Sequence, residues 1–258
     1  MTSTLQHSGY LAGRSMRLLA RQPAYLVFTL LQPMVWLLLF SQLFQRVTDV
    51  PGFGYDSYVT FLTPGVIVMT AIMSANWAGT SFIDDMRTGV LDRNLTSPVS
   101  RAGMVNGALA YWAVVTTVQA LIVFGVGLLL GARFAGGLVG VLLVIVSANL
   151  LALVFAAFSC AMALVVRSQE TLIGMSMFIT LPLTFLSSVL MAPSLLPDWI
   201  QTVTKFNPVD WAAVASRTAL SADPDWGVVG GRLALLAGLL VVMTFLATRA
   251  FRAYQRAV

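Results

Sequence analysis

Long runs of uncharged, mostly apolar residues alternate with short polar segments along the chain. The runs that contain no Asp, Glu, Lys or Arg cover residues 22–45, 57–83, 107–132, 134–166 and 171–197. Each run exceeds the roughly 20 residues that a helix needs to cross the hydrocarbon core of a bilayer. Hydropathy predicts six membrane-spanning helices, at about residues 25–44, 59–82, 107–130, 138–165, 172–191 and 228–248. The expected fold is an all-α polytopic membrane protein, with residues 1–258 forming one transmembrane domain.

Three of the predicted spans contain a residue that is unusual in a membrane helix. Arg232 falls in the first turns of the sixth predicted span, where its long side chain can reach the membrane interface. Pro64 and Pro182 lie inside the second and fifth spans, and each removes one backbone hydrogen bond. We therefore expect both of these helices to bend.

The composition narrows the class of protein. Residues of the AVILMFWYC set make up 58% of the chain and charged residues 10%, whereas a soluble domain carries about 25% charged residues. This balance excludes a soluble enzyme and a disordered chain, and it excludes a nucleic-acid partner despite the net charge of +5. The single cysteine, Cys160, and the single histidine, His7, exclude a disulfide, a cysteine metal cluster and bis-histidine haem ligation. We expect no metal or cofactor in this chain.

The basic residues predict the orientation. With a cytoplasmic N-terminus, ten of the 15 basic side chains fall in inner segments and five in outer segments. Because cytoplasmic loops carry the excess of Arg and Lys, both termini are expected in the cytoplasm. One lysine beside 14 arginines is typical of a GC-rich bacterial source, so the expected location is a bacterial cytoplasmic membrane.

The predicted spans are polar in places but carry no charge apart from Arg232. Proton-coupled carriers and channels often place ionisable side chains inside the membrane, and neither pattern is present here. Energy for uphill transport would therefore come from another polypeptide. Neutral polar side chains that could line a substrate path are Gln32, Asn76, Thr180, Thr184 and Ser187. Interhelical hydrogen bonding is the alternative role for each of them.

The N-terminal segment at residues 8–22 is expected to form an amphipathic helix on the inner membrane surface. Arg14, Arg17 and Arg21 fall within one arc at 100° per residue, and Pro23 marks the turn into the first span. Such a helix anchors the chain to anionic lipid, and it can also dock a partner.

The inner connection at residues 84–106 is rich in charge. Gly89 begins a short helical run in which Leu91 and Leu95 share a face, and Ser97-Pro98 ends it. A short charged helix between two spans can transmit a push in either direction. A solvated connector is equally compatible with this pattern.

The outer connection at residues 192–226 is divided by Pro193, Pro197 and Asn207-Pro208. Leu196, Trp199, Ile200, Val203 and Phe206 follow at helical spacing, which predicts an apolar face resting in the outer interface. A second short helix is expected at residues 209–220. A structured lid without a transport role is the alternative interpretation.

The segment from Gly89 to Arg101, GVLDRNLTSPVSR, resembles the inner-loop motif of the type-2 ATP-binding-cassette (ABC-2) exporter permeases. This family includes the daunorubicin-resistance permeases and the polysaccharide and Nod-factor exporters. The motif has a glycine, an aliphatic pair, an acid, a leucine and Thr/Ser-Pro. Asp92 stands where the family commonly has Glu, which keeps the charge but shortens its reach. The resemblance extends over essentially the whole chain.

The resemblance implies a permease that is driven by a separate cytoplasmic ABC ATPase, present in two copies, which binds ATP and Mg. The chain carries no G-x-x-x-x-G-K-[ST] phosphate loop, so it is not expected to be an enzyme by itself. A second copy of the chain, or a related permease, would complete the path. The residues expected to couple to the ATPase are Arg14, Arg17, Arg87, Gly89, Leu91, Asp92, Leu95 and Pro98.

The resemblance also implies short re-entrant helices between spans five and six, because family members carry an LPxW segment and an Asn-Pro there. The corresponding outer-gate residues are Pro197, Trp199, Phe206, Asn207 and Pro208.

The expected substrate is a hydrophobic or amphiphilic drug or lipid, because the predicted path holds no fixed charge. Alternatives are a permease for a polysaccharide or glycolipid, and a structural membrane subunit that transports nothing. An intramembrane protease would need Ser with His or Lys at membrane depth, and His7 and Lys205 both lie outside the spans.

Overall fold

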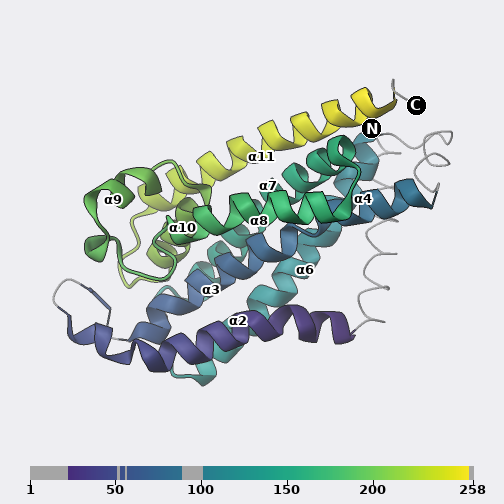
Figure 1. Ribbon diagram of the computed structural model, residues 1–258. Helices are drawn as coiled ribbons and strands as arrows, with labels where there is room; N and C mark the ends of the chain where they lie inside the picture. Colours follow the sequence, from purple (N-terminus) through teal and green to yellow (C-terminus); the bar gives the residue numbers. More distant parts are fainter. Residues whose placement is uncertain (1–22, 51–52, 56, 89–100, 256–258) are drawn as a thin grey trace.

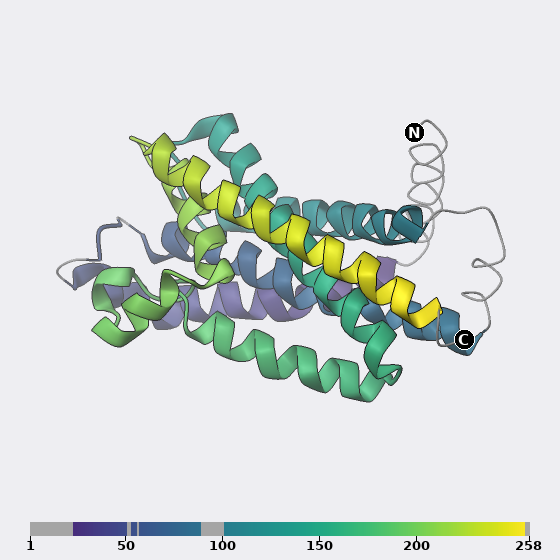
Figure 2. The same ribbon diagram turned by 90° about the horizontal axis from the view of Figure 1, so that it is seen from above.

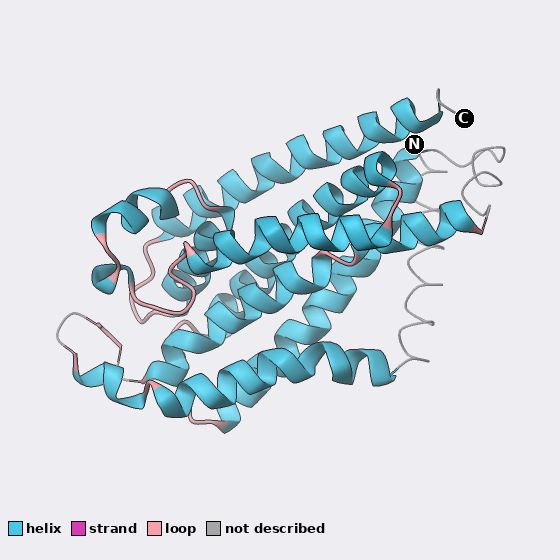
Figure 3. Ribbon diagram, in the orientation of Figure 1, coloured by secondary structure: helices cyan, strands magenta, loops and turns pink. Residues whose placement is uncertain are grey.

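The computed structural model describes residues 23–50, 53–55, 57–88 and 101–255. Within these residues the regular elements are all helices, joined by loops and turns (Figure 3). They are α2 (Pro23–Leu43), η1 (Gln45–Asp49), α3 (Tyr58–Ala75), α4 (Ala78–Arg87), α6 (Arg101–Leu129), α7 (Gly137–Val166), α8 (Gln169–Phe185), η2 (Pro193–Leu195), α9 (Asp198–Thr204), α10 (Pro208–Leu220) and α11 (Trp226–Gln255).

The long helices form one bundle with two distinct ends. The α2–α3 connection and the short helices α9 and α10 lie at one end, and the far ends of α4 and α11 lie at the other (Figure 1). Viewed from above, α11 crosses the bundle with α8 along one side and α6 along the other (Figure 2). The ends are called here the outer end and the inner end, after the orientation that the sequence predicts.

Among the described residues, four helical stretches are long and apolar enough to cross a membrane: Tyr58–Arg87, Asn106–Leu129, Gly137–Val166 and Trp226–Phe251. These agree with the second, third, fourth and sixth predicted spans, so the chain is an all-α membrane protein. The described apolar part of α2, Thr29–Leu43, is shorter, and α8 has 17 residues. The count of six spans stays a prediction.

Helix α7 forms the centre of the bundle and packs against α3, α4, α6, α10 and α11. Its small residues Ala148, Ala152, Ala156 and Cys160 repeat at every fourth position and are all buried. Small side chains in one row let neighbouring backbones approach closely, which is how membrane helices associate. In the most apolar 18-residue window of each helix, 83% of the α3–α4 residues are buried but only 11% of the α11 residues, so α11 lies at the periphery.

The second predicted span is divided at Asn76 and Trp77, while a bend at Pro64 stays a prediction. α3 runs through Pro64 without interruption and ends at Ala75, and α4 begins at Ala78 after a turn at Asn76 and Trp77. Side chains from other helices bind the backbone at this turn, as described below. A proline costs one hydrogen bond, and this loss alone does not end α3.

Candidate functional site

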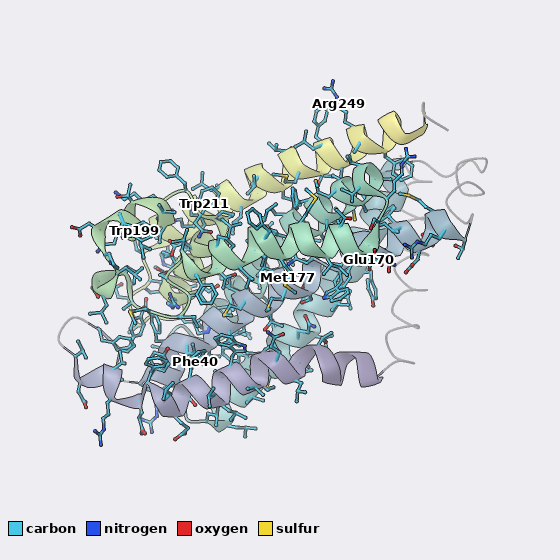
Figure 4. All side chains as sticks on the ribbon, in the orientation of Figure 1. Phe40, Glu170, Met177, Trp199, Trp211 and Arg249 are labelled. Atoms are coloured by element: carbon cyan, nitrogen blue, oxygen red, sulfur yellow. The ribbon has the colours of Figure 1, made fainter. Side chains whose placement is uncertain are left out.

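At the inner end, a side-chain hydrogen bond ties α4 to α8. Gln169 Nε2 donates to Asp84 Oδ1 at 2.6 Å, and Arg87 is exposed in the last turn of α4. The hydroxyl of Ser168 accepts from the backbone N–H of Thr171 and so caps α8. Glu170 lies at this end, and Arg249 projects outward near the C-terminal part of α11 (Figure 4). The start of the predicted coupling loop is thus attached to α8.

One of the eight predicted coupling residues lies in the described part of the chain. Arg87 belongs to the described residues, whereas the other seven, Arg14, Arg17, Gly89, Leu91, Asp92, Leu95 and Pro98, lie outside them. Their contribution to ATPase coupling therefore stays a prediction.

A groove of about 340 Å³ lies between α2 and α3 and contains Gln32. Its other lining residues are Thr29, Pro33, Thr70, Met73, Ser74 and Trp77. Gln119 of α6 is buried behind the groove: its Nε2 donates to Thr29 Oγ1 at 3.1 Å, and its Oε1 accepts from Ser74 Oγ at 2.8 Å. This network joins α2, α3 and α6. The side chain of Gln32 is exposed and forms no hydrogen bond with the described residues.

Of the other predicted path residues, Asn76 follows α3, Thr180 and Thr184 belong to α8, and Ser187 lies just after α8. Asn76 Nδ2 donates to Thr180 Oγ1 at 2.9 Å. Thr184 and Ser187 donate to backbone carbonyls of α8, and both are buried. The hydroxyl of Ser159 donates to the Asn76 carbonyl at 2.7 Å and accepts from Gly79 N–H at 3.0 Å. These bonds satisfy the backbone at the turn between α3 and α4.

At the outer end, Asn207 caps two helices at once. Its Nδ2 donates to the carbonyls of Leu183 at 2.7 Å and Leu186 at 2.8 Å, and its Oδ1 accepts from Val209 N–H at 2.9 Å. Pro208 occupies the first helical position of α10, where a missing N–H costs nothing. Because Asn207 takes these carbonyls, α8 ends at Phe185, six residues before the end of the predicted span.

The chain after α8 is held by side chains from three directions. Asp210 Oδ1 accepts from Ser188 N–H at 2.9 Å, and Tyr58 donates to the Leu190 carbonyl at 3.0 Å. Arg217 donates to the carbonyls of Ser188 at 2.7 Å, Val189 at 2.6 Å and Phe61 at 3.2 Å. Its guanidinium also lies over the Phe61 ring, 3.8 Å from the centroid. Residues 186–190 are therefore fixed without regular secondary structure.

Asp210 and Arg217 belong to the outer connection at residues 192–226, yet both are buried, with 4% and 6% of their surface exposed. Burial lowers the pKa of Arg217 to about 10, while Tyr55, Asp210 and Tyr58 favour its charged form. It therefore carries a full charge at neutral pH. The spacing of Asp210 and Arg217 is the sequence signal for this arrangement, because residues seven apart lie on one face of a helix.

The remaining outer-gate residues face outward. Trp199 of α9 and Phe206 after it are 61% and 79% exposed, and Pro197 precedes the first turn of α9. Trp211 of α10 donates from Nε1 to the Lys205 carbonyl at 2.7 Å, and both tryptophans lie at the outer end (Figure 4). The structure thus joins Asn207 to α8, places Pro208 in the first turn of α10, and leaves the apolar side of α9 uncovered by the described residues.

Comparison with known proteins gives the family. The chain matches the model of the ABC-2 type transporter over residues 7–220. It is 32% identical to the daunorubicin resistance ABC transporter permease protein DrrB1 of Streptomyces coeruleorubidus over 257 residues, which cover 98% of this chain and 87% of that protein. It is 29% identical to the probable doxorubicin resistance ABC transporter permease protein DrrC of Mycobacterium tuberculosis over 189 residues, or 73% of this chain and 68% of that protein. It is 28% identical to the putative transport permease ycf38 of Cyanophora paradoxa over 197 residues, or 75% and 67% of the two chains. The chain belongs to the ABC-2 type transporter family, and it is a membrane permease of that family.

Proposed function

We propose that this chain is the transmembrane subunit of an ABC exporter that moves a hydrophobic or amphiphilic compound, a drug or a lipid, across a bacterial cytoplasmic membrane. The observation that carries the proposal is the neutral groove between α2 and α3, in a chain similar over 98% of its length to a daunorubicin resistance permease. The groove offers Gln32 and Trp77 to a ligand and has no charged lining residue among those described. A weakly polar, uncharged surface suits an amphiphile better than an ion.

In this proposal α2 and α8 complete six spans, and both termini are cytoplasmic. α9 and α10 then dip back into the membrane from the outer face and form the gate around Asn207. Two observations support this arrangement: the outer-end loops all lie at one end of the bundle, and α10 packs into it against α3, α7 and α11.

Two permeases, either two copies of this chain or this chain and a related one, would enclose the path. The energy would come from two copies of a cytoplasmic ABC ATPase that bind ATP and Mg. These would dock at the inner end on the segment at residues 8–22, which the sequence predicts to be a helix, and on the loop after Arg87. The hydrogen bond between Asp84 and Gln169 supports this role, because it gives movement of that loop a direct route to α8.

Substitutions in the coupling motif test the proposal. Asp92→Arg and Leu91→Asp, made in the chain expressed with its ABC ATPase, should lower substrate-stimulated ATP hydrolysis and co-purification of the ATPase. Arg46→Glu is the control, because Arg46 lies in η1 at the other end of the molecule. Unchanged hydrolysis and unchanged co-purification in both coupling variants would refute the docking site.

The alternatives predict different transport results. A polysaccharide or glycolipid exporter would hydrolyse ATP in response to its glycan and not in response to a drug-like amphiphile. A structural subunit would retain the ATPase but move no compound. ATP-dependent accumulation of an amphiphile such as daunorubicin in inside-out vesicles supports the proposal over both.

A further inference from the structure

A second cavity lies at the outer end, apart from the α2–α3 groove. Its volume is about 550 Å³, within the range of small-molecule sites. The first turns of α3, the turn between α6 and α7, and the end of α10 form its walls. The polar or charged residues that line it are Tyr55, Ser57, Thr60, Arg133, Arg217 and Ser221.

Arg217 lies in the wall of this cavity as a buried cation. Its hydrogen bonds go to backbone carbonyls and to Ser188 Oγ, which are neutral acceptors. Asp210 favours its charge but uses Oδ1 on Ser188 N–H, and no ion pair joins it to Arg217. Burying a cation among neutral acceptors is costly, so a buried cation of this kind is a candidate to bind an anionic ligand.

Three further groups face the cavity with donors to spare. The side chain of Arg133 is exposed, and only its backbone N–H is engaged, by Thr60 Oγ1 at 3.2 Å. The hydroxyls of Tyr55 and Ser57 form no hydrogen bond with any described residue. No acidic residue is among the described residues that line the cavity. The described wall therefore offers the unengaged guanidinium of Arg133, the positive charge of Arg217 and two hydroxyls, and no carboxylate is among its described lining residues.

We propose that this cavity binds the phosphate of an anionic headgroup. Guanidinium groups match phosphate oxygens in geometry and charge, and hydroxyls complete the donor set. Phe134 and Leu220 in the same wall suit the glycerol and first methylenes of an amphiphile. The bound phosphate could belong to a phospholipid or to a small soluble anion. Assignment to the outer leaflet rests on the proposed orientation, whereas binding itself does not require transport or an ATPase.

Binding of short-chain lipids to the purified full chain in a neutral detergent tests this site. The probes are dioctanoyl phosphatidylglycerol, dioctanoyl phosphatidylcholine and inorganic phosphate, and the readout is the dissociation constant by calorimetry. Arg133→Gln removes a charge and Tyr55→Phe removes a hydroxyl donor, and neither group forms a hydrogen bond with a described residue. A phenylalanine ring at this position can keep the ring contacts that Tyr55 makes with Phe53 and Phe61. Arg46→Gln is the matched control, because it removes an exposed outer-end arginine that does not line the cavity.

The wild-type chain should bind one phosphatidylglycerol saturably and at least about ten-fold more tightly than phosphatidylcholine, whose choline the arginines repel. Arg133→Gln should weaken binding about ten-fold or more and Tyr55→Phe several-fold, as expected for lost hydrogen bonds to a charged group. Arg46→Gln should leave the affinity unchanged. If inorganic phosphate binds with the same dependence on Arg133, the natural ligand is a soluble anion, and if only the lipid binds, it is a headgroup. Equal losses in Arg133→Gln and Arg46→Gln, or no saturable binding, would overturn the proposal.

Discussion

Asp210 and Arg217 hold opposite sides of one residue, Ser188. Asp210 Oδ1 accepts from its backbone N–H at 2.9 Å, and Arg217 Nη1 donates to its carbonyl at 2.7 Å. The two side chains are seven residues apart, almost two helical turns, so they project from one face of α10. Since Arg217 also binds the Phe61 carbonyl, this arrangement joins α10, the chain after α8 and the start of α3 into one outer unit.

Removing the Arg217 guanidinium should destabilise this unit. In Arg217→Met three buried carbonyls lose their charged donor and Asp210 loses its neighbouring cation, so we expect a loss of about 3–5 kcal/mol. Thermal unfolding of the purified variant in detergent measures it. Arg217→Lys should lose less, because an ammonium keeps the charge but lacks the planar fork. A melting temperature for Arg217→Met equal to that of Arg46→Met would show that the buried contacts carry no stability.

Gly65 is required by a close backbone approach. A Cβ at this position would overlap the Val189 carbonyl oxygen, which is the atom that Arg217 Nη2 binds. Gly65→Ala should therefore lower the melting temperature of the purified protein by several degrees. Gly125→Ala is the control: a Cβ there meets open space, so the change should be neutral or slightly stabilising through helix propensity. Equal melting temperatures for the two variants would contradict this packing.

Substitutions of Gln32 and Asn76 should have different effects, the first on transport and the second on stability. Gln32 is exposed in the groove, so Gln32→Ala should alter the ATP-dependent transport rate or its substrate preference and leave the melting temperature unchanged. Asn76 is bonded to Thr180, so Asn76→Ala should cost about 1 kcal/mol of stability, the size of an interhelical hydrogen bond in a membrane. If Gln32→Ala transports every tested amphiphile at the wild-type rate, the groove is not the path.

Cysteine labelling tests the orientation. The native Cys160 is buried, so a membrane-impermeant maleimide should not label the wild-type chain. Thr202→Cys on the exposed side of α9 should label in intact cells, whereas Thr96→Cys should label only after the cells are opened. The opposite pattern would invert the topology, and labelling of both variants in intact cells would refute the six-span arrangement.

The sequence allowed the helical class and the main apolar segments to be predicted, because a long uncharged run is stable in a bilayer as a helix, which satisfies its own backbone hydrogen bonds. The break at Asn76 and Trp77 could not be predicted. It depends on Ser159 and Thr180, which reach the turn from other helices, and no local signal marks these contacts. Pro64 gave a stronger local signal and left α3 uninterrupted.

The contacts of α10 at the outer end were predicted only in part, because they too depend on residues from other helices. The Asn207-Pro208 pair predicts the start of a helix, and α10 begins there. The hydrogen bonds from Asn207 Nδ2 to the carbonyls of Leu183 and Leu186 depend on how α10 packs against α8. The charges of Asp210 and Arg217 resemble those of a solvated loop until the burial of α10 is known, so both were missed.

Transport by proteoliposomes that contain the purified chain, either alone or with its ABC ATPase, tests whether the driving force comes from a separate subunit. We expect a fluorescent amphiphile to accumulate against its gradient only when the ATPase and ATP are both present, and the chain alone to move none. Accumulation against the gradient in vesicles that contain only this chain would refute the dependence on an ATPase.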